Sequence, residues 1–263
     1  MLLFNNLLRP TSLEEAYQMA IKHKFAPLLA GTCWTRLGRR IHPFVIDLSA
    51  LGLDYIRQED SEIVIGAMAT QAAVERNPDL QALCGGVLPK AVHEILGVQF
   101  RNMATMGGSV AAKFGFSDII PTLLALHADV ILVQGGRMTL EEYVNNYKAR
   151  DILVEIRIPH QEVPIAIEAL RISRGDFPLL TGAVARHGHN YEVYIGTRPG
   201  PAVLITKASA LLTQEGAEAA KKAGDLVAEE LIFQSNSHAS GQYRASMASN
   251  MVQRLVKEVA QWK

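Results

Sequence analysis

The chain has 263 residues, of which 49% are hydrophobic, and its 26 lysines and arginines balance 26 aspartates and glutamates. A formal net charge of zero argues against a nucleic acid or an anionic membrane as the main partner. The length suits one large domain or two ordinary ones, and no apolar run approaches the length of about 18 residues that a membrane span needs.

The N-terminal third predicts helices and strands in alternation. The first 26 residues indicate an extended segment and then a helix, because Thr11 and Glu14 have the spacing of a capping box. Residues 27–29 then form a short apolar strand that runs into a hydroxyl-rich glycine turn at Gly31. That turn is a candidate phosphate cradle, although a plain strand–turn–helix junction explains it better by itself. We expect further strands over 44–48 and 62–67, a helix over 71–76 capped by Thr70, and a mainly buried helix over 87–96.

Residues 101–133 are the most informative stretch. They contain a turn of small residues at 104–109, where two adjacent glycines leave bare backbone that can lie against a ligand. Thr105 and Ser109 place hydroxyl groups on either side. A helix then begins with Pro121 in its first turn and ends near Ala128, and 130–133 is typical of a buried strand. Exposed N–H groups, hydroxyls and a helix start together suit a phosphate-bearing ligand, although an ordinary tight turn is the simpler interpretation of the glycine pair alone.

The remainder of the chain continues the mixed pattern. Gly135 and Gly136 indicate a hairpin-like turn, Thr139 opens a capping box with Glu142, and a strand over 152–158 ends at Pro159. Interrupted periodicity at 160–165 predicts a domain boundary. Beyond it we expect strands over 166–173, 179–187 and 191–197, and helices over 201–213, 216–231 and 242–261. This alternation favours an α/β or an α+β architecture.

Several kinds of chemistry are absent from the sequence. It lacks the glycine motifs of nicotinamide and P-loop sites and the motifs of serine hydrolases and zinc proteases. His187 and His189 could touch a metal ion, but a glycine turn between two strands fits them better, and we treat the other histidines as structural. Cys33 and Cys84 are too few to hold an iron–sulfur cluster or a four-ligand zinc ion, and they suit a reduced cytoplasmic protein. Any redox chemistry must therefore come from a bound cofactor.

A resemblance to a known family rests mainly on residues 101–128. The run RNMATMGGSVA at 101–111, followed by Ser117-Asp118 and by PTLLALHA at 121–128, closely resembles the flavin-binding subunit of molybdenum hydroxylases. That family includes xanthine dehydrogenase and aerobic carbon monoxide dehydrogenase. Supporting likeness extends over essentially the whole chain, at 28–32, 65–70, 153–159, 171–174 and 240–244. The resemblance implies an α+β fold. It would have a two-subdomain FAD-binding domain of the PCMH (vanillyl-alcohol-oxidase-like) type over 1–160, followed by a smaller α/β C-terminal domain over 165–263.

The resemblance also implies non-covalently bound FAD. In the family, two glycine loops hold the diphosphate between them. Carried over, Asp118 would accept hydrogen bonds from the ribityl or ribose hydroxyls, and Leu153 would pack on the flavin side. Arg171, where the family often has lysine, would stabilise the reduced flavin or the diphosphate. The implied cofactor-binding residues are Leu28, Leu29, Ala30, Gly31, Thr32, Cys33, Trp34, Thr35, Thr105, Met106, Gly107, Gly108, Ser109, Asp118, Leu153 and Arg171. No catalytic residue and no metal ligand is implied on this chain.

The function that the resemblance implies is electron transfer inside a complex. A large partner would carry the molybdenum cofactor, a small partner would carry 2Fe-2S clusters, and FAD would pass electrons to NAD or another acceptor. The whole would be a cytoplasmic heterotrimer that binds no nucleic acid. Two alternatives stay open, a cofactor-free structural subunit and a free-standing flavin oxidoreductase. The first is motivated by Thr32 and Trp34, because the family commonly has a second glycine and then a small or acidic residue in this loop, and a side chain at position 32 restricts positive φ.

Overall fold

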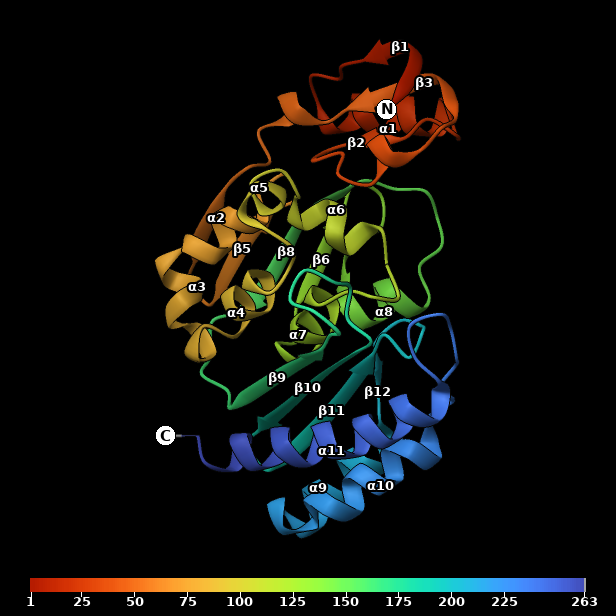
Figure 1. The fold of residues 1–263 in the computed structure, drawn as a ribbon. Helices are drawn as coiled ribbons and strands as arrows, with labels where there is room; N and C mark the ends of the chain where they lie inside the picture. The colour runs from red at the N-terminus through yellow and green to blue at the C-terminus, as the bar shows by residue number, and fades with distance from the viewer. Residues whose placement is uncertain (263) are drawn as a thin grey trace. The chain divides into compact units, whose positions relative to one another are not determined.

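The computed structural model describes residues 1–262, which divide into two compact units (Figure 1). Unit 1 comprises residues 1–77, 97–112 and 128–159, and unit 2 comprises residues 78–96, 113–127 and those from 160 onward. Two stretches of the first 160 residues therefore pack with the C-terminal part of the chain. The boundaries predicted from the sequence, 1–160 and 165–263, differ from this structural division and stay a prediction about functional domains.

Unit 1 contains two separate sheets and short helices. Its strands are β1 (Leu3–Leu8), β2 (Leu28–Leu29), β3 (Ile41–Asp47), β4 (Ile56–Glu59), β5 (Glu62–Gly66), β6 (Asp129–Leu132), β7 (Gly136–Thr139) and β8 (Leu153–Pro159). Its helices are α1 (Leu13–Lys22), α2 (Gln71–Arg76), α5 (Val98–Arg101), α6 (Met106–Ala111) and α8 (Leu140–Asn145), with single 3₁₀ turns at Thr35–Leu37 and Ser49–Leu51. The first sheet is parallel, in the order β1-β3-β2, and the second is antiparallel, in the order β4-β5-β8-β6-β7.

Hydroxyl side chains fix where the helices of unit 1 begin. Ser12, Thr70, Thr105 and Thr139 each accept a hydrogen bond from a backbone N–H in the first turn of α1, α2, α6 and α8. The caps predicted at Thr70 and Thr139 are confirmed. The cap of α1 is Ser12 rather than Thr11, because the Glu15 carboxylate binds the backbone N–H and the hydroxyl of Thr11.

Unit 2 is built on one antiparallel sheet in the order β12-β11-β10-β9. Its strands are β9 (Ile165–Leu170), β10 (Leu180–His187), β11 (Asn190–Gly196) and β12 (Val203–Leu204). Its helices are α3 (Pro78–Ala82), α4 (Val87–His93), α7 (Ile119–Ala125), α9 (Thr206–Glu215), α10 (Ala220–Glu230) and α11 (Gly241–Ala260), with 3₁₀ turns at Leu83–Gly86 and Ala217–Ala219.

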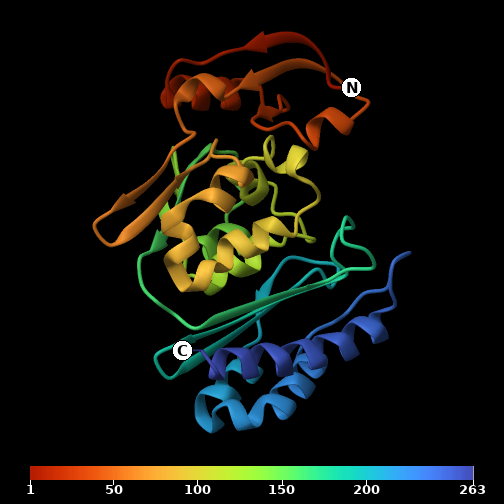
Figure 2. The same cartoon turned by 60° about the vertical axis from the view of Figure 1, so that its left-hand side comes forward.

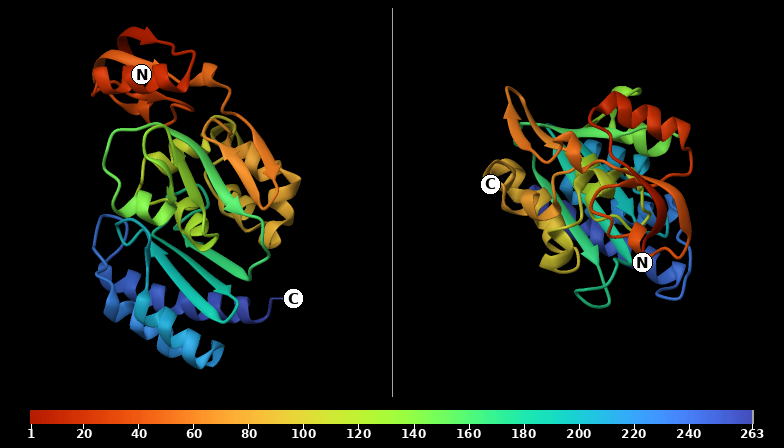
Figure 3. Two further views of the ribbon diagram at one scale, coloured as in Figure 1. Left: turned by 180° about the vertical axis from the view of Figure 1, so that it is seen from behind. Right: turned by 90° about the horizontal axis from the view of Figure 1, so that it is seen from above.

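The sheet of unit 2 lies between two helical layers. Helices α9 and α11 pack on one face and α10 packs against both of them, while α4 and α7 lie on the other face, as Figures 1 and 2 show. Figure 3 shows the same layers from behind. The long helix α11 packs closely on α10 because Gly224 carries no side chain, and a β-carbon there would lie 2.5 Å from the carbonyl oxygen of Ser249. The buried apolar side chains of the sheet and of α9, α10 and α11 form one continuous core.

Most sequence-predicted elements are present, with shifted ends in unit 2. Helix α7 ends at Ala125 rather than near Ala128, and β9 ends at Leu170 rather than at 173. The helix expected from 201 begins at Thr206, because Val203 and Leu204 pair with β11 as an edge strand. Position 216 is a glycine with φ of +75°, which separates α9 from α10. None of the helices in residues 1–262 has the length and apolar character that crossing a membrane requires.

Candidate functional site

The two predicted glycine loops meet inside unit 1. Gly31 follows β2, and its Cα lies directly against the backbone of residues 103 and 104, just before Thr105. A β-carbon on Gly31 would overlap the carbonyl oxygen of Met103 and lie 3.1 Å from the Cα of Ala104. Since both neighbours are main-chain atoms that cannot rotate away, only glycine fits at this contact.

A third segment joins them at the end of β5. The backbone N–H of Gly107 donates to the carbonyl of Ala67 at 2.8 Å, and that of Met106 donates to the carbonyl of Ala69 at 2.8 Å. Thr70 and Thr105 form an isolated antiparallel bridge. A β-carbon on Gly107 would lie 2.6 Å from the carbonyl oxygen of Ala67. Residues 66–70 and 105–109, which are far apart in the sequence, are therefore locked together by backbone contacts.

The second loop is the start of helix α6, which corrects the prediction of exposed N–H groups there. The N–H of Gly108 donates to the Thr105 hydroxyl at 3.2 Å, and the N–H of Ser109 donates to the Thr105 carbonyl at 3.0 Å. Together with the bonds to residues 67 and 69, these account for the four amides from Met106 to Ser109. The prediction fails because helix capping and the bridge to residues 67–70 use the same donors that a phosphate would need.

The first loop has the unused donors that the second lacks. Within residues 1–262, no other residue accepts a hydrogen bond from the backbone N–H of Gly31, Thr32 or Cys33. Thr32 has a left-handed φ of +55°. Successive amides around a left-handed residue converge and form a concavity that attracts anions. The Cys33 thiol turns inward and donates to the Gly31 carbonyl at 3.5 Å, and burial raises its pKa.

Thr32 adopts the conformation that a glycine would take with less strain. A β-branched residue in the left-handed region costs roughly 1–2 kcal/mol. We therefore expect Thr32→Gly to raise the free energy of unfolding by about 1 kcal/mol and to preserve or strengthen FAD binding, because the amide concavity is kept. Thr35, at the start of the 3₁₀ turn, is the matched control, and Thr35→Gly should lower stability. Urea unfolding and FAD titration measure both effects, and a destabilised Thr32→Gly variant would contradict this account.

Leu153 lies beside these loops in unit 1, at the beginning of β8. It is 6% exposed. The register of β8 against β6 shifts at this point, since Leu132 pairs with Leu153 while Ile131 pairs with Glu155. The extra residue of this bulge, Val154, accepts the backbone N–H of Ala67 through its carbonyl at 2.9 Å. Bulges commonly redirect a side chain next to a binding site, and this one ties β8 to residue 67.

Asp118 and Arg171 belong to unit 2 and are bound to each other. The guanidinium Nη2 of Arg171 donates to Oδ1 of Asp118 at 2.5 Å, and both side chains are less than 10% exposed. Arg171 Nε also donates to the carbonyl of Asp176 at 3.2 Å. Burial raises the pKa of Asp118 to about 6, and the charge of Arg171 opposes that rise. The two residues to which the resemblance gave separate cofactor roles therefore form one buried ion pair.

Gln71 is a site residue that the sequence analysis missed. Its side chain is 3% exposed, and Nε2 donates to the Ser109 hydroxyl at 3.1 Å. The Ser109 hydroxyl in turn donates to the carbonyl of Thr105 at 2.8 Å. Oε1 of Gln71 is buried and accepts no hydrogen bond from the described residues. The only indication of this role in the sequence is that a polar residue directly follows Thr70, the predicted helix cap.

Comparison with known proteins identifies a family and several relatives. The family described as the FAD binding domain in molybdopterin dehydrogenase matches residues 3–161. The carbon monoxide dehydrogenase medium chain of Hydrogenophaga pseudoflava is 30% identical over 219 residues, which are 76% of this chain and 75% of that one. Aldehyde oxidase 2 of Cavia porcellus is 28% identical over 182 residues, which are 58% of this chain and only 13% of that protein.

The fold has a close match among solved structures. A chain of the Cu,Mo-CO dehydrogenase in its cyanide-inactivated form superposes with a TM-score of 0.86 at 25% identity, covering 98% of both chains. The expected mixed fold with an FAD-binding domain is therefore confirmed.

Proposed function

Because this chain belongs to the family of FAD binding domains in molybdopterin dehydrogenases, we propose that it is the electron-transfer flavin subunit of a molybdenum hydroxylase. In that role it takes electrons from iron–sulfur clusters on a small partner subunit and passes them to NAD or another acceptor. The observation that carries the proposal is the convergence of three glycine-containing segments, at 31, 66–70 and 105–109, within the matched residues 3–161.

The first loop is the part of the chain best suited to the FAD diphosphate. Its three unused amides offer donors around one point, and the loop has no side chain at Gly31 that would push it away from residues 103 and 104. We assign the residues from Leu28 to Thr35 to this contact. The segment from Thr105 to Ser109 takes part through the exposed backbone of Gly108 rather than through free amides, because its two hydroxyls are already hydrogen-bonded inside the chain.

Leu153 stays a predicted contact of the flavin ring system, on the part of β8 that Val154 ties to residue 67. When it is bound, FAD accepts electrons singly or in pairs, which lets one chain join one-electron clusters to a two-electron acceptor. The chain itself fixes the loops through the contacts of Gly31 with residues 103 and 104 and of Gly107 with Ala67. For Asp118 and Arg171, the predicted contacts with the cofactor stay predictions, and any such contact has to share the carboxylate and the guanidinium with the ion pair that already joins them.

The partners of the proposed complex follow from what this chain lacks. Its two cysteines are too few for iron–sulfur clusters, so these and the molybdenum cofactor require other subunits. The named medium chain of carbon monoxide dehydrogenase supports such a division between subunits. Aldehyde oxidase 2 supports a division of functions between separate regions. The region that matches this chain is only 13% of that much longer protein, and the rest of it lies outside the match. A heterotrimer and a cytoplasmic location remain part of the proposal.

The test is the visible spectrum of the purified full-length protein. We expect the absorption of oxidised flavin, bleached by dithionite, with about one FAD per chain. A colourless protein that takes up no added FAD would overturn the proposal and favour a structural subunit without cofactor. Turnover of a substrate by the isolated chain would instead favour a free-standing flavin oxidoreductase. Copurification from the native host then identifies the partner subunits.

A further inference from the structure

Three side chains of unit 2 that play no part in the proposed flavin site converge on one point. Nε2 of His127 lies 2.7 Å from Oε2 of Glu192, and Nε2 of His187 lies 3.8 Å from the same oxygen. One possible ligand atom from each of the three residues lies within 4.8 Å of the other two. The sequence analysis treated His127 as structural and considered His187 only together with His189, because nothing in the spacing along the chain connects residues 127, 187 and 192.

The fold holds the three residues on separate elements. His187 ends β10 and Glu192 lies in β11, and the intervening turn has Gly188 at a φ of +64°. This turn pairs Ala185 with Glu192, so His187 and Glu192 are diagonal neighbours on one face of the hairpin. His127 follows α7, which packs on both strands. Its own φ of +53° turns the chain at the helix end and brings the ring to within 3.8 Å of the His187 ring, in a nearly parallel stack.

Two imidazoles and one carboxylate form a familiar ligand set. Zinc binds imidazole nitrogen and carboxylate oxygen at about 2.0–2.2 Å, so its ligand atoms lie about 3.0–3.5 Å apart. The observed separations of 2.7 and 3.8 Å bracket this range. Because imidazole binds a metal ion in the plane of its ring, one of the two stacked rings must rotate out of the present stack, in which the planes differ by 7°, when both bind one ion. Three protein ligands leave further coordination positions open, as in catalytic zinc sites and in sites with two histidines and one carboxylate.

We propose that His127, His187 and Glu192 form a binding site for a divalent transition-metal ion of the zinc type. The ion would join the end of α7 to the β10–β11 hairpin. Carboxylate and imidazole ligands together exclude the soft thiolate-preferring ions, and the nitrogen ligands disfavour magnesium and calcium, which select oxygen.

Neighbouring groups already orient the ligands. The Tyr194 hydroxyl donates to Oε2 of Glu192 at 3.0 Å, which fixes the carboxylate as outer hydrogen bonds do in metal sites. Nε2 of His187 lies 3.1 Å from the carbonyl of Ala125. Because a carbonyl only accepts, Nε2 carries the proton in this arrangement, and the metal ion replaces that proton.

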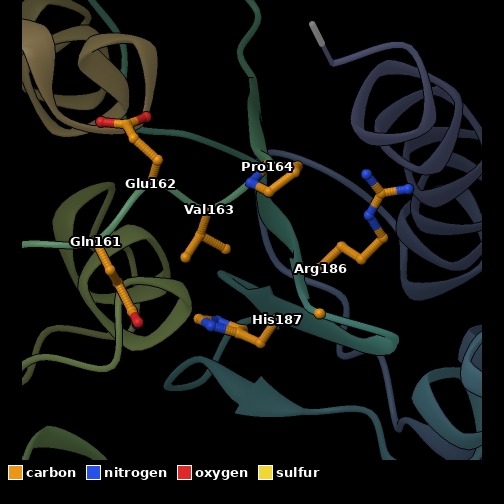
Figure 4. Close-up of a pocket in the computed structure, with 7 residues that line it drawn as sticks. Gln161, Glu162, Val163, Pro164, Arg186 and His187 are labelled. Carbon is orange, nitrogen blue, oxygen red and sulfur yellow. The ribbon is translucent and has the colours of Figure 1, made fainter.

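Two of the three side chains are directly exposed to solvent. The side chains of His127 and Glu192 are 42% and 23% exposed. His187 also lines a hollow of about 410 Å³, shown in Figure 4, between the 161–164 segment and the end of β10. The lining residues are Gln161, Glu162, Val163, Pro164, Arg186, His187 and Gly188. An ion can therefore enter, and water can occupy the remaining coordination positions.

The experiment measures zinc and cobalt binding to the full-length protein after treatment with a chelator. We expect one zinc ion per chain by calorimetry, and a Co²⁺ visible absorption that zinc displaces. His127→Asn is the first variant, because asparagine tolerates the left-handed backbone, and Glu192→Gln is the second, because it keeps the shape of the side chain. Each should weaken zinc binding by about 100-fold or more. His189→Asn, on the same turn, is the matched control and should bind zinc as the unchanged protein does.

Melting curves without metal, together with FAD content, establish that the variants fold. Should one variant fail to fold, the other decides the outcome. The proposal is overturned if the unchanged protein binds no zinc at micromolar concentration. It is equally overturned if Glu192→Gln binds zinc as tightly as His189→Asn does, because the ion would then sit on other residues and the cluster would be only an ion pair between His127 and Glu192.

Discussion

Replacing Gly31 with alanine is expected to abolish FAD retention while most of the chain stays folded. The new methyl group would overlap the carbonyl oxygen of Met103, and the backbone there has no room to rotate away. The loop must then move from residues 103 and 104, which displaces the three unused amides from the point where they converge. We expect FAD affinity to fall by at least about 100-fold, or ~3 kcal/mol.

Fluorescence titration with FAD and the flavin content after gel filtration measure this effect. Gly97→Ala is the matched control in the same unit, because its new methyl group meets only Oε1 of the flexible Gln99 side chain, at 3.2 Å. This variant should keep its flavin. A Gly31→Ala protein with full flavin content would show that the contact with residue 103 does not position the cofactor site.

Replacing Gly107 with alanine is expected to destabilise the protein, whereas the same change at its neighbour is not. A methyl group on Gly107 would lie 2.6 Å from the carbonyl oxygen of Ala67, inside a backbone contact that is completed by a hydrogen bond. Overpacking of this kind costs about 1–3 kcal/mol. A methyl group on Gly108 meets only the Thr105 hydroxyl, at 3.0 Å, and alanine favours the helix by roughly 0.5–1 kcal/mol over glycine.

Urea unfolding of the two variants measures the difference in midpoint. We expect Gly107→Ala to unfold at clearly lower urea than the unchanged protein, and Gly108→Ala to unfold close to it. The pair separates a packing role of the glycines from a direct role in phosphate binding. Equal loss of stability in both variants would contradict the assignment, and equal loss of FAD without loss of stability would restore the second loop as the main diphosphate contact.

The residues at 104–109 correctly indicate the family, but the local structure that the sequence predicts for them is wrong. The sequence predicts a turn at 104–109 whose glycines expose backbone amides, but Gly107 and Gly108 lie in helix α6 and need no positive φ. Whether an amide is free depends on acceptors elsewhere in the chain, here the carbonyls of residues 67 and 69. Conversely, Thr32 takes the left-handed conformation that its side chain disfavours, because the loop is held against residues 103 and 104 from outside.

Some site residues could not have been paired from the sequence by any local rule. Asp118 and Arg171 are separated by 53 residues, and each alone suggests a cofactor contact. Burial decides otherwise, because a buried charge that lacks a partner is costly, and each of these residues supplies the partner of the other. The same argument applies to His127, whose ring meets residues 187 and 192 only after α7 packs on the sheet.

Elements with short-range causes could be predicted from the amino-acid sequence. Hydroxyl caps at Thr70 and Thr139, the hairpin turn at Gly136 and the alternation of strands and helices follow from interactions within a few residues, so they could be predicted. Three further features became known from the folded chain alone: which donors stay unused, which charges pair, and which glycines are required by packing. Those outcomes depend on contacts between segments distant in the chain, and a single sequence does not encode them as a pattern that can be recognised locally.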